Sequence, residues 1–92
     1  MKKKIAILGS TGSIGKSLLS IINKDKKKFK IILLSARKNY KVLLNQANHF
    51  KVRNIIITDS ESYKKAIAKS KNININIYNN FDYFDKIFNS KI

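Results

Sequence analysis

The sequence contains no cysteine and no proline, and only three of its 92 residues are glycine. Without cysteine, the chain has no disulfides, no thiolate nucleophile and no cysteine-based zinc site. It has one histidine, His49, and five aspartates and glutamates in total, so it is poor in acid–base and metal-binding groups. A chain of this length forms one small domain with one modest core.

Long apolar runs are also missing. The stretch Ile5-Ala6-Ile7-Leu8 follows three lysines but stops at Gly9, whereas the apolar part of a signal peptide needs roughly 7–15 residues. A membrane-spanning helix needs about 20. We therefore expect a soluble, cytoplasmic chain without a membrane partner.

The charge balance is strongly one-sided, with 20 lysines and arginines and a formal net charge of +15. A basic surface can bind nucleic acid or anionic lipid through non-specific electrostatics. Lysine, asparagine and isoleucine all have A/T-rich codons, however, so a biased genome also explains this composition. The lysines are spread along the chain, and no interleaving with aromatic residues marks a base-stacking surface. Nucleic-acid binding is therefore kept only as an alternative function.

Strand-like and helix-like patterns alternate along the chain. Short apolar runs predict buried strands at Lys4–Leu8, Lys30–Leu34 and Asn54–Thr58. Residues Ile73, Ile75 and Ile77 alternate with asparagines and predict a fourth strand, at an edge, with one wet face. The alternation favours an α/β fold: an incomplete, Rossmann-like parallel sheet of about four strands with helices on both faces, forming one unit over residues 1–92.

Helical periodicity between these strands predicts which residues face the core. Asp59 and Ser60 are candidate N-caps for the third helix. The predicted inner faces are Ile14, Leu18, Ile21 and Ile22 in the first helix; Tyr40, Leu43, Leu44 and Ala47 in the second; Tyr63, Ala66 and Ile67 in the third; and Phe81, Phe84, Ile87 and Phe88 in a short last helix.

A glycine-rich turn joins the first strand to the first helix, with the spacing Gly-x-x-Gly-x-x-Gly. Glycine permits a tight turn and lets the backbone approach a pyrophosphate closely. Free N–H groups at the following helix N-terminus donate to phosphate oxygens, and the serine and threonine hydroxyls add donors. The strand–turn–helix context predicts a dinucleotide site. Its candidate residues are Gly9, Ser10, Thr11, Gly12, Ser13, Ile14 and Gly15.

A phosphate-binding P-loop for ATP or GTP is a second interpretation of the same segment, because Gly15-Lys16-Ser17 resembles the end of that motif. The P-loop requires a glycine five positions before its second glycine, and Ser10 stands there. Gly9 is one residue too far back. The spacing therefore disfavours a P-loop.

The end of the second strand bears on the choice of dinucleotide. NAD-binding units place an acidic residue there to accept hydrogen bonds from the ribose 2′-hydroxyl. This chain instead has Arg37, Lys38 and Asn39. Two adjacent cations suit the 2′-phosphate of NADP, which Arg37 could bind bidentately. We therefore predict NADPH as the cofactor.

Residues 4–15, Lys-Ile-Ala-Ile-Leu-Gly-Ser-Thr-Gly-Ser-Ile-Gly, resemble the start of the 1-deoxy-D-xylulose-5-phosphate reductoisomerase family. Lys38-Asn39 and the segments Gln46–Phe50 and Asn54–Asp59 extend the resemblance to about residue 70. It implies an NADPH-dependent isomerisation and reduction of 1-deoxy-D-xylulose 5-phosphate to 2-C-methyl-D-erythritol 4-phosphate. That reaction uses magnesium or manganese and belongs to non-mevalonate isoprenoid biosynthesis. The resemblance also implies that the full-length enzyme is a homodimer.

The resemblance places specific residues at the cofactor. It implies that Thr11, Gly12, Ser13 and Ile14 contact the NADPH phosphates and that Lys38 and Asn39 lie at the adenosine end. Arg37 departs from the family pattern, which has glycine at that position, and it could either add a 2′-phosphate contact or crowd the pocket.

The family's metal-binding carboxylates, substrate-phosphate site and mobile lid all lie beyond residue 92. We therefore assign no catalytic and no metal-binding residue to this chain. Asp82 and Asp85 are interpreted as capping or solvated residues, and His49 as a packing residue. The chain is expected to be the N-terminal part of the NADPH-binding domain, a fragment or truncated product that cannot complete the reaction alone.

Overall fold

Four strands, each followed by a helix, form one parallel sheet in the computed structural model, which describes residues 2–71 and 73–89. The sheet order is β1-β2-β3-β4, so each strand pairs with its neighbour in the chain. This confirms the predicted α/β class. The elements are β1 (Lys3–Ile7), α1 (Ser13–Asn23), β2 (Phe29–Ala36), α2 (Tyr40–Phe50), β3 (Asn54–Ile57), α3 (Ser60–Lys69), β4 (Asn76–Tyr78) and α4 (Phe84–Phe88).

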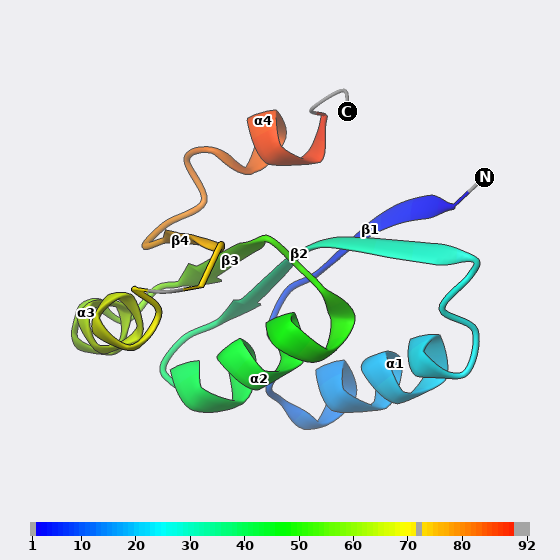
Figure 1. Ribbon diagram of the computed structural model, residues 1–92, viewed down its shortest axis with the longest axis horizontal. Helices are drawn as coiled ribbons and strands as arrows, with labels where there is room; N and C mark the ends of the chain where they lie inside the picture. The colour runs from blue at the N-terminus through cyan, green and yellow to red at the C-terminus, as the bar shows by residue number, and fades with distance from the viewer. Residues whose placement is uncertain (1, 72, 90–92) are drawn as a thin grey trace.

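The two faces of the sheet are covered unequally: α1, α2 and α3 lie on one face and the short α4 lies on the other (Figure 1). Leu34 and Ile55 are fully buried on the first face together with Leu43 of α2. Leu33 and Ile56 are fully buried on the face that α4 covers. Because β2 and β3 are covered on both sides, their sequences are almost continuously apolar.

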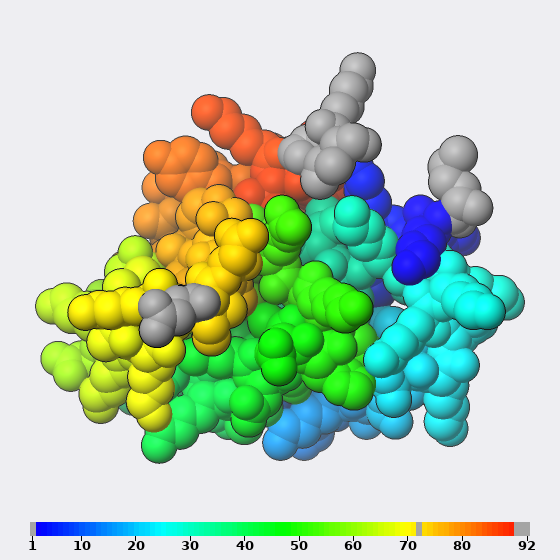
Figure 2. Space-filling model, in the orientation of Figure 1, coloured from blue at the N-terminus to red at the C-terminus, as the bar shows by residue number. Residues whose placement is uncertain are grey.

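A β-bulge where β1 pairs with β2 changes which side chains of β2 lie on each face of the sheet. Ile5 pairs with Ile31 and Ala6 pairs with Leu33, so Ile32 is the extra residue of a bulge. Ile32 and Leu33 therefore both pack on the α4 side. In Figure 2 the red surface of α4 lies at the top of the molecule, next to green and teal surfaces.

The predicted inner face of α1 is wrong in three of its four positions. Ile22 is buried, but Ile14, Leu18 and Ile21 are 79%, 44% and 63% exposed. The buried face is Gly15, Leu19 and Ile22 instead. The cause is a close approach of the helix to the glycine turn: a Cβ on Gly15 would lie 2.5 Å from the Gly9 carbonyl oxygen. This contact sets the rotation of α1.

The other predicted helix faces are mostly confirmed. Leu43 and Ala47 of α2 are buried, as is Ala66 of α3. Ile67 is 41% exposed, contrary to prediction, and Ser62 is buried on α3 in addition to Ala66. Asp59 is the N-cap of α3, as its position predicted.

The fourth strand lies at an edge of the sheet, as predicted, but it is shorter than the isoleucine alternation suggested. It spans only Asn76–Tyr78, so Ile73 and Ile75 precede it, and Ile73 is 52% exposed. Phe81, predicted to face the core, precedes α4 and is 41% exposed. Within residues 2–71 and 73–89, the structure contains no helix with both the length and the apolar character needed to cross a bilayer.

Candidate functional site

The turn after β1 has the backbone geometry that its glycines permit. Gly9 has a φ of +71°, in the left-handed region that favours glycine. The Gly12 N–H donates to the Gly9 carbonyl at 3.1 Å and closes the turn. Gly12 then stands as the N-cap of α1 in an extended conformation. The chain thus reverses direction within a few residues and starts a helix directly beside the end of β1.

The first half of this turn is anchored to β2 and α2. The Gly9 N–H donates to the Ser35 hydroxyl at 3.0 Å, and the Ser10 N–H donates to the Ser35 carbonyl at 2.9 Å. The Ser10 hydroxyl donates to Gln46 Oε1 at 2.7 Å, and Gln46 Nε2 donates back to the Ser10 carbonyl at 2.9 Å. Ser10 is completely buried.

These bonds change the interpretation of Ser10. The sequence suggested that its hydroxyl donates to a phosphate, but both its hydroxyl and its N–H are used inside the protein. Its role is to hold the turn in shape. Its hydrogen-bond partners, Ser35 and Gln46, were not predicted from the sequence. The available signal was Ser35, a serine in the otherwise apolar β2.

The second half of the turn presents unused donors. The N–H of Lys16 is the first in α1 to find a helical partner, the Gly12 carbonyl at 2.9 Å. The N–H groups of Ser13, Ile14 and Gly15 precede it and have no intrahelical acceptor. Among the described side chains none caps this helix, and its first turn contains no acidic residue. These N–H groups lie at the positive end of the helix dipole, an arrangement that binds anions.

Arg37, Lys38 and Asn39 lie at the same edge of the sheet as the turn. Ser35 bonds to Gly9 and Ser10, and the Asp59 N–H donates to the Arg37 carbonyl at 3.0 Å, so the carboxyl ends of β1, β2 and β3 meet there. Arg37 and Lys38 are exposed. The side chain of Asn39 caps α2 by accepting from the Val42 N–H at 3.4 Å. The structure thus brings together the two groups of residues that the sequence predicted separately.

Asp59 also lies at this edge, where its carboxylate caps α3. The hydroxyl and N–H of Ser62 donate to it at 2.7 and 3.0 Å. These two bonds lower the pKa of Asp59 below its usual value, and the nearby charges of Lys38 and Arg37 lower it further. Nowhere in residues 2–71 and 73–89 do three His, Cys, Asp or Glu side chains form a group suited to a metal ion.

The remaining titratable candidates lie elsewhere. His49 is exposed, but its ring makes an edge contact with the Phe50 ring, with centroids 4.8 Å apart. Its Nε2 lies 3.1 Å from Asn23 Oδ1, which links α2 to α1. Asp85 lies in the first turn of α4, and Asp82 is exposed just before it. Cavities of 510, 220 and 770 Å³ lie near the amino ends of the strands, not at the glycine turn.

Comparison with known proteins identifies relatives of this chain. The family model described as 1-deoxy-D-xylulose 5-phosphate reductoisomerase matches residues 5–91. The reductoisomerase of Pelagibacter ubique is 53% identical over 88 residues, covering 96% of this chain and 23% of the relative. That of Buchnera aphidicola is 45% identical over 74 residues, covering 80% of this chain and 19% of the relative.

Solved structures agree with the sequence relatives. A Zymomonas mobilis reductoisomerase in complex with NADPH superposes with a TM-score of 0.83 at 24% identity, covering 95% of this chain and 23% of the other, which establishes the shared fold. A reductoisomerase in complex with NADPH, fosmidomycin and magnesium superposes with a TM-score of 0.77 at 29% identity, covering 83% and 19%. This chain therefore spans less than a quarter of the length of the relatives it matches.

Proposed function

This chain belongs to the 1-deoxy-D-xylulose 5-phosphate reductoisomerase family, and from that premise we propose that it supplies the first half of an NADPH-binding domain. One observation carries the proposal. The N-terminus of α1, uncapped by any described side chain, stands behind a glycine turn whose shape is fixed by Ser35 and Gln46. Such a helix end is a preformed site for a pyrophosphate.

Different residues of the turn have different roles in binding. The N–H groups of Ser13, Ile14 and Gly15 donate to the pyrophosphate, and the hydroxyls of Thr11 and Ser13 add further donors. Gly9 provides the left-handed backbone conformation of the turn, Gly12 is the N-cap of α1, and Ser10 holds the turn in place. Because the donors are fixed before the ligand arrives, little conformational entropy is lost when the ligand binds.

The cations at the end of β2 select the phosphorylated form of the dinucleotide. Arg37 and Lys38 are exposed and adjacent at the sheet edge that carries the turn. A guanidinium binds a phosphate bidentately, and a lysine adds a point charge. No carboxylate occupies the position that would bind a ribose 2′-hydroxyl; Asp59, nearby, is used as the cap of α3. Asn39 contributes by starting α2 at this point.

The reaction proposed for the complete enzyme is the family's isomerisation and reduction of 1-deoxy-D-xylulose 5-phosphate to 2-C-methyl-D-erythritol 4-phosphate, in isoprenoid biosynthesis. When bound, NADPH supplies the hydride. The part played by this chain is to bind and orient that cofactor. Its described side chains do not fit a metal site, so no metal-dependent step is assigned to them. We also propose that the complete enzyme acts in the cytoplasm as a homodimer.

Thermal melts with different nucleotides test this function against the P-loop alternative. We expect NADPH to raise the melting temperature of the chain, and Mg·ATP to raise it less. The rise should be small, because half of a dinucleotide crevice is formed by other segments in this fold. A larger shift with Mg·ATP that is lost in Lys16→Ala would instead support a P-loop. No shift with NADPH would refute the proposal.

A further inference from the structure

A cavity of 770 Å³ lies where β1, β2, β3 and β4 begin, at the end of the sheet opposite the glycine turn. It is bounded by the starts of the strands, by the segment between α2 and β3, and by α4. In Figure 2 the red surface of α4 adjoins the teal and green surfaces of these segments. Its volume falls within the roughly 300–1,000 Å³ of small-molecule sites.

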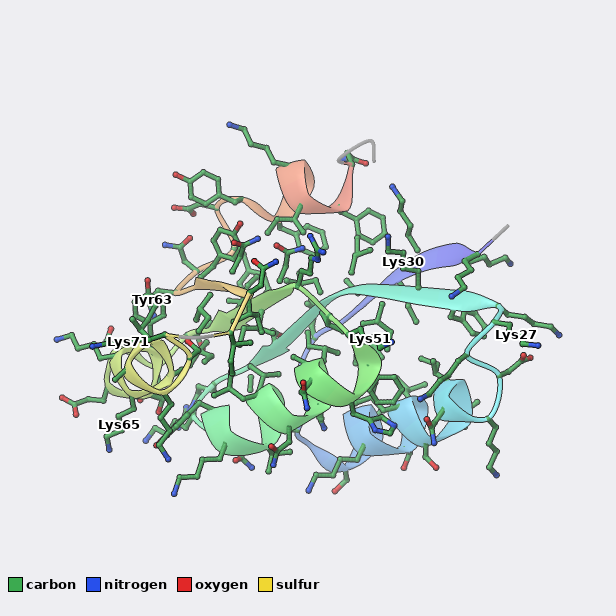
Figure 3. All side chains as sticks on the ribbon, in the orientation of Figure 1. Lys27, Lys30, Lys51, Tyr63, Lys65 and Lys71 are labelled. Carbon is green, nitrogen blue, oxygen red and sulfur yellow. The ribbon has the colours of Figure 1, made fainter. Side chains whose placement is uncertain are left out.

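Cations surround this cavity. Lys30 is exposed and directly precedes the buried part of β2. Lys51 and Arg53 lie between α2 and β3, and Lys86 belongs to α4. Lys30 and Lys51 are labelled in Figure 3. Among the described residues that line the cavity none carries a carboxylate. The charges of Lys30, Lys51 and Arg53 are therefore not neutralised by a described residue of the cavity wall, and they favour an anionic ligand.

Part of the cavity lining is aromatic and apolar. The rings of Tyr78 and Tyr83 lie with centroids 5.8 Å apart and an angle of 40° between them. Tyr83 is 53% exposed, and the Lys86 ammonium lies 5.9 Å from its ring centroid. Ile87 of α4 and the buried Ile32 complete this part of the lining. Such a surface suits a flat ring, since bases stack on aromatic side chains.

Two asparagines at the starts of adjacent strands stiffen the cavity. Asn76 Nδ2 donates to Asn54 Oδ1 at 3.1 Å, and Asn54 Nδ2 donates to the Ile32 carbonyl at 3.2 Å. The Asn76 N–H also donates to the Arg53 carbonyl at 2.7 Å. The backbone that carries Arg53 is thus tied to β4.

We propose that this cavity binds a nucleotide, with its base against Tyr78, Tyr83 and Ile87 and its phosphates on Lys30, Lys51 and Arg53. The site is separate from the proposed NADPH site, because it lies at the amino ends of the strands. A free nucleotide is favoured over a nucleic-acid strand because the aromatic and cationic residues line a single cavity of nucleotide size. The proposal does not depend on the function proposed for the glycine turn.

The test is an NMR titration of the 92-residue chain with ADP, without magnesium and without NADPH. The side-chain amide signals of Asn54 and Asn76 should shift with ADP. The double variant Lys30→Gln/Arg53→Gln should weaken ADP binding about tenfold or more, since two charge-assisted contacts are lost. Tyr83→Ala should weaken it through loss of stacking. Circular dichroism verifies that each variant is folded.

The matched control is Lys64→Gln/Lys65→Gln, which removes the same charge from the exposed surface of α3. It should leave ADP binding within about twofold of the parent chain, because exposed charges more than a Debye length away are screened. Equal weakening by both double variants would overturn the proposal in favour of non-specific attraction. Inorganic pyrophosphate binding as tightly as ADP would overturn it by showing that the base is not recognised. Tighter binding of a single-stranded oligonucleotide than of ADP would replace it with a nucleic-acid surface.

Discussion

A Cβ added to Gly15 would lie 2.5 Å from the carbonyl oxygen of Gly9, and also 2.5 Å from the Cα of Ser10. Helix α1 and the end of β1 therefore touch at a point where only a hydrogen fits. The same contact decides which side of α1 faces the sheet and aims the helix N-terminus at the open edge. Packing and cofactor binding both depend on this relationship.

Gly15→Ala should destabilise the chain, because the atoms that it meets are backbone and cannot move aside cheaply. We expect a loss of about 1–3 kcal/mol in the free energy of unfolding, typical of overpacking. Urea denaturation measures it. Gly12→Ala is the matched control, since its added Cβ would have an ordinary contact of 3.5 Å with the Gly9 oxygen. Equal losses in the two variants would show that the close approach does not limit packing.

Ser10→Ala should also destabilise the chain, even though it removes a single oxygen. Gln46 would keep its bond to the Ser10 carbonyl but lose the hydroxyl that donates to Oε1. Leaving a part-buried acceptor without its donor costs about 1–3 kcal/mol. Ser17→Ala, at an exposed position of α1, should cost much less in the same denaturation experiment. A Ser10→Ala chain as stable as the parent would contradict the anchoring role.

Polar substitutions of Ile14, Leu18 and Ile21 should leave stability nearly unchanged. These side chains are exposed, and surface changes usually stay within about 0.5 kcal/mol. Leu19→Ala should instead cost about 2–5 kcal/mol, because Leu19 belongs to the core. Thermal melts compare the triple glutamine variant with Leu19→Ala. A large loss of stability in the triple variant would instead support the buried face of α1 that the sequence predicted.

Acidification should weaken the start of α3 through Asp59. Its pKa in the folded chain is lowered by the two bonds from Ser62. The stabilisation is therefore fully present above the unfolded pKa of about 3.9 and disappears as the pH falls through the lower, folded value. Asp59→Asn keeps a capping oxygen but does not titrate. Between pH 5 and pH 2, about the range in which this proton binds, the parent chain should lose more stability than Asp59→Asn. Parallel losses would show that Asp59 does not contribute.

Much of the fold followed from local pattern. The apolar runs at β2 and β3 and the turn residues between elements require only near neighbours to be recognised. The rotation of α1 was different, because Ile14, Leu18, Ile21 and Ile22 form a helical stripe as regular as the true one. Only the three-dimensional contact of Gly15 with the Gly9–Ser10 backbone distinguishes the two.

The candidate site was likewise only partly predictable from local sequence pattern. Glycine spacing predicted where the turn lies, and the cations after β2 were visible as a pair in the sequence. The internal use of Ser10 was not visible, because its partners Ser35 and Gln46 lie 25 and 36 positions away. Long-range hydrogen bonds of this kind determine whether a hydroxyl faces a ligand or the protein.

Cofactor selectivity should depend on Arg37 and Lys38. In Arg37→Gln/Lys38→Gln, NADPH affinity should fall about tenfold or more while NADH affinity changes little, because only NADPH carries the 2′-phosphate. Calorimetric titrations measure both. Lys64→Gln/Lys65→Gln removes equal charge and should preserve the preference. If the ratio of the two affinities is unchanged in Arg37→Gln/Lys38→Gln, these cations do not bind the 2′-phosphate.

The most direct measurement is an NMR titration of the chain with NADPH that follows the backbone amides of Ser13, Ile14 and Gly15. If the uncapped start of α1 holds the pyrophosphate, these three signals should shift together and saturate with one affinity. They should saturate at a lower NADPH concentration than signals at the amino ends of the strands. Shifts confined to other surfaces, with these amides unmoved at saturation, would contradict a dinucleotide site at the glycine turn.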